Sequence, residues 1–260
     1  MKRIFFAFFL IANFAYAQPA VNEKILKVDS QNGTTQAGVI SFVSKDASTL
    51  VVIAPGSPSL AKSSINFFNN KVQIQQDGSF VVRERKRLLS EEIATLVLDC
   101  RSDFATRCAP EYQISEQRFI DIKPLIELAK SEFSSIKNVW LLSTSLGLFT
   151  SAGVPKYSGD YFQGVIHTAG VVDLVQDYPT TNQFFFHHKD DPCNITKYTT
   201  AKAVADKINA PIVTVYGGSG FYGGACQAHT QHGFQGMEEK VMLHISNLIK
   251  TGKLDSLEIR

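Results

Sequence analysis

From residue 18 onward the sequence alternates between short strand-like runs and longer helical patterns, and this alternation limits the fold more than any other feature. Runs rich in branched or aromatic residues predict strands over residues 37–43, 49–54, 93–98, 139–142, 164–167, 183–187 and 212–216. Apolar residues at helical spacing predict helices over residues 116–133, 199–208 and 238–249. Such alternation is typical of a mostly parallel sheet with helices on both faces, and we expect antiparallel strands before Thr49. No linker or repeat divides the chain, so we expect one α/β domain.

The first seventeen residues have the pattern of a secretory signal. A basic start at Lys2 and Arg3 precedes an apolar run over residues 4–15, and the Ala-Tyr-Ala motif at 15–17 matches a small-x-small cleavage site. A membrane anchor is the alternative, but the run is too short to cross about 30 Å of hydrocarbon. We therefore expect the signal at 1–17 to be removed, leaving a soluble domain over residues 18–260 that is secreted or periplasmic. No later stretch is long and apolar enough to span a membrane.

Charge excludes two classes of partner. The 26 Lys and Arg residues include Lys2 and Arg3, so their removal leaves 24 basic residues against 24 Asp and Glu, a net charge of zero. Proteins that bind nucleic acid or anionic membranes usually carry an excess of positive charge. We therefore expect no nucleic-acid partner, and nothing in the sequence implies a protein partner.

Export also affects the interpretation of the four cysteines, because thiols in oxidising compartments form disulfides. Three pairings are possible. We favour Cys100 with Cys108, across a short loop, and Cys193 with Cys226, which would join two distant loops; free buried thiols are the alternative. The absence of a CxxC spacing argues against thiol redox chemistry and against a cysteine zinc cluster.

One serine stands where a buried strand is followed by a small-residue turn and an apolar helix start. The segment at 139–148 reads VWLLSTSLGL. In a nucleophile elbow, G-x-S-x-G, small residues two places before and after the serine let strand and helix approach while its Oγ stays exposed. Ser143 and Gly147 fill these places around Ser145, and Ser143 departs from the usual glycine while remaining small. The alternative is that Ser145 merely caps the helix.

Candidate acids and bases follow this serine in the chain. The segment HHKDDPC at 187–193 follows a predicted strand and offers Asp190 or Asp191, and an acid on a strand-end loop can orient an imidazole. The segment CQAHTQHGF at 226–234 follows the last predicted strand and offers a histidine base. His232 is favoured over His229 because Gly233 lets the loop turn directly after it.

Together these three segments resemble the α/β-hydrolase superfamily, in which the order Ser, Asp, His is typical. The resemblance is strongest to small exported bacterial members with an H-H-x-x-D-x-C segment before a C-x(n)-H-G-F segment, and it covers about residues 35–250. It implies Ser145 as nucleophile, Asp191 as acid and His232 as base, with no cofactor and no metal. The D-x-C spacing favours Asp191 over Asp190, and a Cys193–Cys226 bridge would hold the acid and base loops together.

An oxyanion hole needs two backbone donors, of which one is the N–H of the residue after the nucleophile, Leu146. The second donor is expected in the loop after the strand at 49–54. Gly56 and Ser57 are the candidates there, because the flanking prolines have no N–H. This loop lacks the histidine that the family usually has before the glycine, and a simple tight turn is the alternative.

These features predict an exported serine hydrolase that cleaves an ester, or less readily an amide, through an acyl-enzyme intermediate. We therefore expect a small-molecule or acyl substrate. The short connection between His167 and Gln183 leaves no room for more than a minimal cap. A non-catalytic α/β-hydrolase-like binding protein is the main alternative, supported by Ser143 and the unusual oxyanion loop.

A metal hydrolase is a third possibility. It would use His187, His188, an Asp and either His229 or His232, but the sequence has no H-E-x-x-H helix. The histidines outside the predicted site, at 167, 187, 188 and 244, are assigned to packing or turns.

Overall fold

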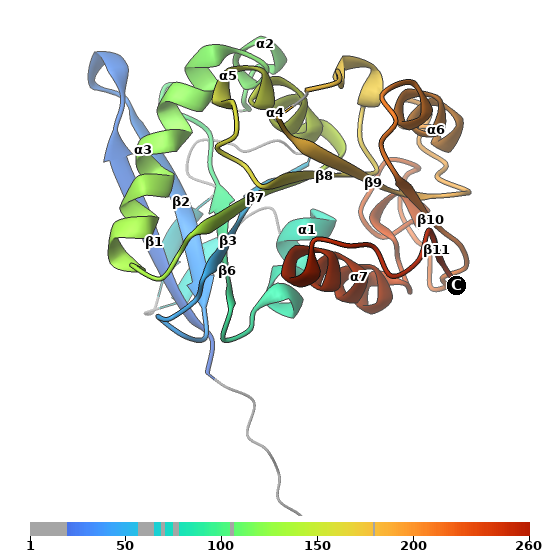
Figure 1. Cartoon of the computed structure of the whole chain (residues 1–260), viewed down its shortest axis with the longest axis horizontal. Helices are drawn as coiled ribbons and strands as arrows, with labels where there is room; N and C mark the ends of the chain where they lie inside the picture. The colour runs from blue at the N-terminus through green and yellow to red at the C-terminus, as the bar shows by residue number, and fades with distance from the viewer. Residues whose placement is uncertain (1–19, 57–64, 69–70, 75–77, 105–106, 179) are drawn as a thin grey trace, which may run out of the picture.

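The fold is built on one twisted sheet in which seven strands run parallel (Figure 1). The computed structural model describes residues 20–56, 65–68, 71–74, 78–104, 107–178 and 180–260, so the expected signal peptide at 1–17 and the candidate donor Ser57 lie outside the described residues. In the described chain the sheet has nine strands in the order β1-β2-β6-β3-β7-β8-β9-β10-β11. Their bounds are β1 Asn22–Asp29, β2 Thr35–Phe42, β3 Thr49–Ala54, β6 Ile93–Leu98, β7 Asn138–Thr144, β8 Gly164–Thr168, β9 Asn182–His188, β10 Ile212–Val215 and β11 Glu258–Ile259.

The antiparallel strands lie at one edge of this sheet. Strand β2 runs antiparallel to both β1 and β6, as expected for the segment before Thr49. A separate two-stranded sheet, β4 Ile65–Phe68 with β5 Lys71–Ile74, follows β3 in the chain. The sequence patterns did not predict this hairpin, or the two-residue strand β11.

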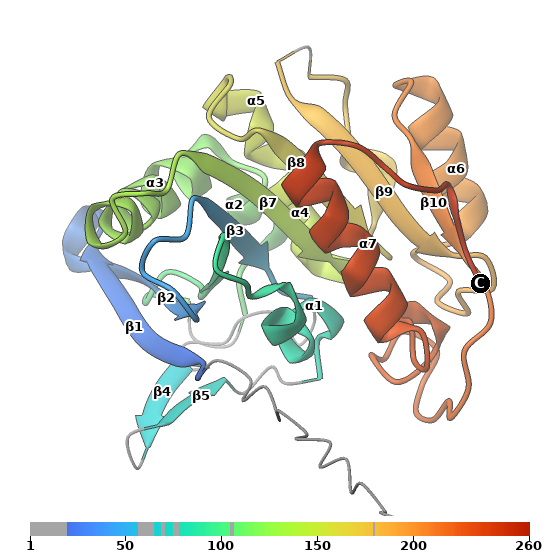
Figure 2. The same cartoon turned by 60° about the horizontal axis from the view of Figure 1, so that its bottom comes forward.

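Helices cover both faces of the large sheet because its central strands are apolar on both sides. In β3, Val51 and Ile53 pack into the core beneath α1 and α7, whereas Leu50 and Val52 pack into the core beneath α3. Figure 2 shows α1 and α7 on the same side of the sheet, and the alternation of side chains along a strand explains how one run serves two cores. The helices are α1 Phe80–Arg83, α2 Pro110–Gln113, α3 Glu116–Glu132, α4 Leu148–Gly153, α5 Pro155–Ser158, α6 Tyr198–Lys207 and α7 Glu238–Thr251.

The fold class predicted from the sequence is confirmed. The three long helices begin and end within two residues of the predicted bounds, and α3 starts after Ser115, whose side chain accepts a hydrogen bond from the Arg118 N–H. Between β8 and β9 the described chain contains only the short 3-10 helix η4 Val172–Leu174, which leaves no cap domain. Within the described ranges, no helix has the length and apolar character needed to cross a membrane.

Parallel pairing places the carboxyl ends of β3, β7, β9 and β10 at one edge of the sheet. The loops that follow these strands carry Gly56, Ser145, Asp191 and His232, which are far apart in the sequence. Ligands of open α/β sheets bind at such an edge, so the topology directs attention to this group of loops.

Candidate active site

Ser145 stands at the sharp turn between β7 and the following helix. Its φ is +52°, a left-handed conformation that is costly for a residue with a Cβ, by about 1–3 kcal/mol. The 3-10 turn η3, Ser145–Gly147, leads directly into α4. Although Ser145 is only 8% exposed, it lines a surface pocket. These are the features expected of a nucleophile elbow.

Gly147 is required by the close approach of the β3 end. A Cβ atom at this position would lie 2.1 Å from the carbonyl oxygen of Ala54 and 2.5 Å from that of Pro55. No side chain fits at these distances. The second small position of the G-x-S-x-G pattern therefore has a direct steric cause in the packing of the elbow against the loop that follows β3.

Ser143, the departure from the first glycine, is accommodated by a buried chain of hydrogen bonds. Its Oγ lies 2.6 Å from Ser151 Oγ on α4, and Ser151 Oγ lies 2.9 Å from His167 Nδ1. His167 Nε2 in turn lies 3.2 Å from Gln183 Oε1. Burial lowers the pKa of His167 to about 4, so this imidazole is neutral at pH 7. The hydroxyl of Ser143 is thus paired with polar partners below the elbow.

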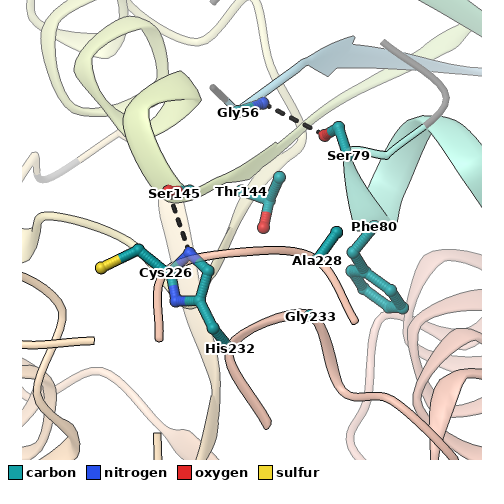
Figure 3. Close-up of a pocket in the computed structure, with 9 residues that line it drawn as sticks. All are labelled: Gly56, Ser79, Phe80, Thr144, Ser145, Cys226, Ala228, His232 and Gly233. Atoms are coloured by element: carbon teal, nitrogen blue, oxygen red, sulfur yellow. Dashed lines mark hydrogen bonds between the residues drawn. The ribbon is translucent and has the colours of Figure 1, made fainter. Parts of the chain in front are cut away.

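His232 reaches Ser145 from the loop after β10. Its Nε2 lies 3.0 Å from Ser145 Oγ, as Figure 3 shows by a dashed line. The backbone N–H of His232 donates to Thr230 Oγ1 at 3.1 Å, which fixes the turn that carries the imidazole. At Gly233 a Cβ atom would lie 1.9 Å from the carbonyl oxygen of Ala228, so the H-G pair reflects tight packing of this loop.

Asp191 lies on the far side of the imidazole. Its Oδ2 is 3.0 Å from His232 Nδ1, and its side chain is fully buried. The Cys193 N–H donates to Oδ1 at 2.9 Å, and the Thr196 hydroxyl donates to Oδ2 at 3.0 Å. Burial would raise the pKa of Asp191, but hydrogen bonds from His187 and His232 outweigh burial and hold this pKa well below its usual range. The carboxylate is therefore ionised at neutral pH.

The rival acid and base point elsewhere. Asp190 is exposed, and its backbone N–H donates to His188 Nδ1. His229 stacks on Tyr222 with ring centroids 4.5 Å apart, and its Nδ1 lies 3.1 Å from Gln235 Oε1.

The positions of the histidines also test the metal-hydrolase alternative. His188 Nε2 donates to the carbonyl oxygen of Gly217, and His229 is engaged as described above. Across the residues that the structure describes, no group of three or more His, Cys, Asp or Glu has the geometry of a metal site. Of the ligand set considered from the sequence, only His187, His232 and Asp191 come together, and there both imidazoles contact the carboxylate itself.

Two of the candidate oxyanion donors, Leu146 and Gly56, belong to the described chain and lie close to Ser145. Leu146 follows the serine in η3. The Gly56 N–H donates to Ser79 Oγ at 3.2 Å, a bond that Figure 3 also draws, so this donor already has a partner in the structure. Beside them is a pocket with about 250 Å³ of empty space, its open mouth included. Its described lining residues are Gly56, Ser79, Phe80, Thr144, Ser145, Cys226, Ala228, His232 and Gly233.

Both predicted cysteine pairs are at bonding distance. Cys100 and Cys108 have sulfurs 1.96 Å apart, and those of Cys193 and Cys226 are 2.01 Å apart. The second pair joins the loop that carries Asp191 to the loop that carries His232. Since Cys226 also lines the pocket, this bridge is part of the wall around Ser145.

Two residues of the site escaped the sequence analysis. His187, assigned there to packing, has its Nε2 3.2 Å from Asp191 Oδ2. Thr196 Oγ1 contacts both Asp191 Oδ2 and, at 3.1 Å, His232 Nδ1. The four-residue spacing of His187 and Asp191 was visible in the sequence, but the direction of the strand-end turn that joins them was not.

Comparison with known proteins identifies the fold. No family sequence profile and no curated protein sequence matches this chain. Among solved structures, an α/β serine hydrolase homologue from Coxiella burnetii is similar with a TM-score of 0.53 and 15% identity, over 87% of this chain and 95% of that one. An α/β serine hydrolase without a lid from Xanthomonas campestris has a TM-score of 0.57 and 10% identity, over 90% and 96%. A cold-adapted esterase from an Arctic intertidal metagenomic library has a TM-score of 0.58 and 12% identity, over 89% and 95%.

These similarities extend over nearly the full length of each structure, and they agree with the mixed sheet and the serine turn described above. The chain therefore has the α/β-hydrolase fold.

Proposed function

We propose that this protein is a serine hydrolase that cleaves carboxylic esters, with Ser145 as nucleophile, His232 as general base and Asp191 as the orienting acid. One observation carries the proposal: the unbroken series from Ser145 Oγ to His232 Nε2 and from His232 Nδ1 to Asp191 Oδ2, with 3.0 Å at each step. In such a series the imidazole takes the proton of the hydroxyl and is oriented by a carboxylate. The ionised side chain of Asp191 provides that carboxylate.

In the proposed reaction, Ser145 Oγ attacks the ester carbonyl as its proton passes to His232 Nε2. The Nδ1–H of His232 donates to Asp191, which holds the imidazole in the required tautomer and stabilises its charged form. Collapse of the tetrahedral intermediate breaks the bond to the alcohol, and the proton on Nε2 moves to the departing oxygen. Water then attacks the acyl-enzyme by the same steps and releases the acid.

The negative charge on the carbonyl oxygen requires backbone donors. We assign one to the N–H of Leu146 and the other to the loop after β3, from Gly56 or Ser57. Because the Gly56 N–H is bonded to Ser79 Oγ, it would have to exchange that partner for the oxyanion.

We also propose that the protein is exported, with residues 1–17 acting as a signal peptide. The basic start, apolar run and Ala-Tyr-Ala motif support this, as do two disulfides, which persist in oxidising compartments. The proposal places the enzyme in the periplasm or outside the cell.

A non-catalytic binding protein is less well supported than the sequence suggested. One of its two arguments was Ser143 in place of glycine, and this hydroxyl is hydrogen-bonded to Ser151 beneath the turn in which Ser145 has a φ of +52°. The unusual oxyanion loop is the argument that remains.

Labelling with a fluorophosphonate probe, together with hydrolysis of p-nitrophenyl acetate, tests the proposed function. Wild-type protein should be labelled and should turn over the ester, while Ser145→Ala should lose the label and at least about 10⁴-fold in kcat. Thermal unfolding should remain cooperative, because the substitution removes only the Oγ atom of Ser145. Retention of a tenth or more of the wild-type rate by Ser145→Ala would show that another group is the nucleophile.

A further inference from the structure

The carboxylate of Asp191 is contacted by two imidazoles, of which the proposed reaction uses only one. His187 is the last residue but one of β9, and Asp191 follows it by four residues in the turn that leaves the sheet. The Nε2 atom of His187 lies 3.2 Å from Asp191 Oδ2, the same oxygen that His232 Nδ1 contacts at 3.0 Å. Both side chains of the His187–Asp191 pair are shielded, at 2% and 0% exposed.

The same His187 nitrogen also donates a hydrogen bond to the backbone carbonyl of Thr196. Because both of its neighbours are oxygen acceptors, Nε2 carries a proton. This one N–H is shared: Thr196 O is its nearer acceptor, and Asp191 Oδ2 is the second, at 3.2 Å. The Thr196 hydroxyl closes the ring by donating to Asp191 Oδ2. His187 therefore binds both ends of the segment 191–196, which carries the proposed acid and the cysteine that bridges to the base loop.

The ring of His187 is itself held in place. Tyr198 packs edge-on against it, with centroids 6.2 Å apart and planes at 69°, and the Tyr198 hydroxyl lies 2.8 Å from Thr214 Oγ1. Thr214 is the residue of β10 that pairs with His187 in the sheet. A rigid strand thus fixes where the Nε2–H points, which is the condition for one side chain to orient another.

We propose that His187 is a positioning residue of the active site, whose Nε2–H holds Asp191 in the orientation that receives His232. This inference rests on the proposed function. His187 does not touch the reacting atoms; it acts through Asp191. Since water has no access to the buried pair, no solvent donor can replace the lost N–H when His187 is changed.

Two substitutions of His187, by amide side chains of different length, test this role. A glutamine side chain places its amide nitrogen about as far from the backbone as His Nε2, whereas an asparagine amide ends near the level of Nδ1. His187→Gln therefore keeps a donor at Asp191, and His187→Asn withdraws it while keeping a polar group. His188→Gln and His188→Asn are matched controls, because His188 has the same strand and burial but bonds Gly217 and Asp190.

The readouts are kcat and KM for p-nitrophenyl acetate and the rate of fluorophosphonate labelling. Loss of a hydrogen bond to a buried charge predicts that His187→Asn lowers kcat and the labelling rate about tenfold or more, with KM within about twofold. His187→Gln should stay within about threefold of wild type, as should both His188 variants. Equal rates for His187→Asn and His187→Gln, or a change confined to KM, would overturn the inference.

Two further outcomes are decisive. If His187→Asn fails to fold, as judged by thermal unfolding, His187→Gln alone decides: a rate near wild type supports a donor role, and a loss of about tenfold or more contradicts it. If wild-type protein neither hydrolyses the ester nor takes the label, the proposed function has failed and this inference fails with it. If wild type reacts but the two His187 variants are equal, only the role of His187 is wrong.

Discussion

Removal of the Cys193–Cys226 disulfide should destabilise this protein more than removal of the Cys100–Cys108 disulfide. The two bridges span 33 and 8 residues of sequence. On the chain-entropy relation, closing loops of these sizes restricts the unfolded chain by about 3.7 and about 2.5 kcal/mol at 25 °C. The longer bridge should thus contribute about 1.2 kcal/mol more to the free energy of unfolding.

The two bridges should differ even more in their effect on turnover. The Cys193 N–H donates to Asp191 Oδ1, and Cys226 lines the pocket beside Ser145. By contrast, Cys100 and Cys108 form a small buried cluster with Tyr112. Release of the first bridge frees the loops that carry the proposed acid and base, whereas release of the second leaves them joined.

Two double variants provide the comparison: Cys193→Ala with Cys226→Ala, and Cys100→Ala with Cys108→Ala. Urea unfolding gives the free energies, and ester hydrolysis is measured at a temperature where both variants are fully folded. The Cys193/Cys226 variant should have the lower unfolding free energy and a kcat reduced about tenfold or more, since misplaced catalytic groups are costly. The reasoning is refuted if the Cys100/Cys108 variant is the less stable one, or if both variants lose kcat equally.

The remaining predictions concern single residues. Asp191→Asn should lower kcat by about 10⁴-fold, because an amide can leave His232 in the wrong tautomer, whereas the exposed Asp190→Asn should stay near wild type; equal effects would mean that neither is the orienting acid. Burial holds the pKa of His167 at about 4 against 6.5 in the unfolded chain, so only the unfolded state takes up this proton as the pH falls from 6.5 to 4. The free energy of unfolding should lose about 3 kcal/mol over this window from His167 alone, and urea titrations of His167→Gln should show a correspondingly smaller loss. If the free energy of unfolding of His167→Gln falls with pH as steeply as that of the wild type, His167 is not a buried neutral imidazole.

Much of the fold could be predicted because its cause is local. Strand β3 is a six-residue run, apolar after Thr49, that is buried on both faces, and α7 has apolar residues at helical spacing along one stripe. These patterns depend only on the periods of strands and helices. The hairpin β4–β5 and strand β11 lack such a signal, because they are short and depend on their partners for stability.

Local patterns in the sequence predict a serine at a strand-to-helix turn, with acids and histidines on later strand-end loops. Which of these side chains meet depends on the tertiary fold: Asp191 is turned inward to His232, while its neighbour Asp190 is exposed. It also decided that Ser143 has a buried partner, that the Gly56 N–H is bonded to Ser79, and that His187 shares the carboxylate of Asp191. These outcomes lie beyond local patterns because contacts with residues distant in the chain set the direction of a side chain in a loop, and the periods of strands and helices carry no information about such contacts.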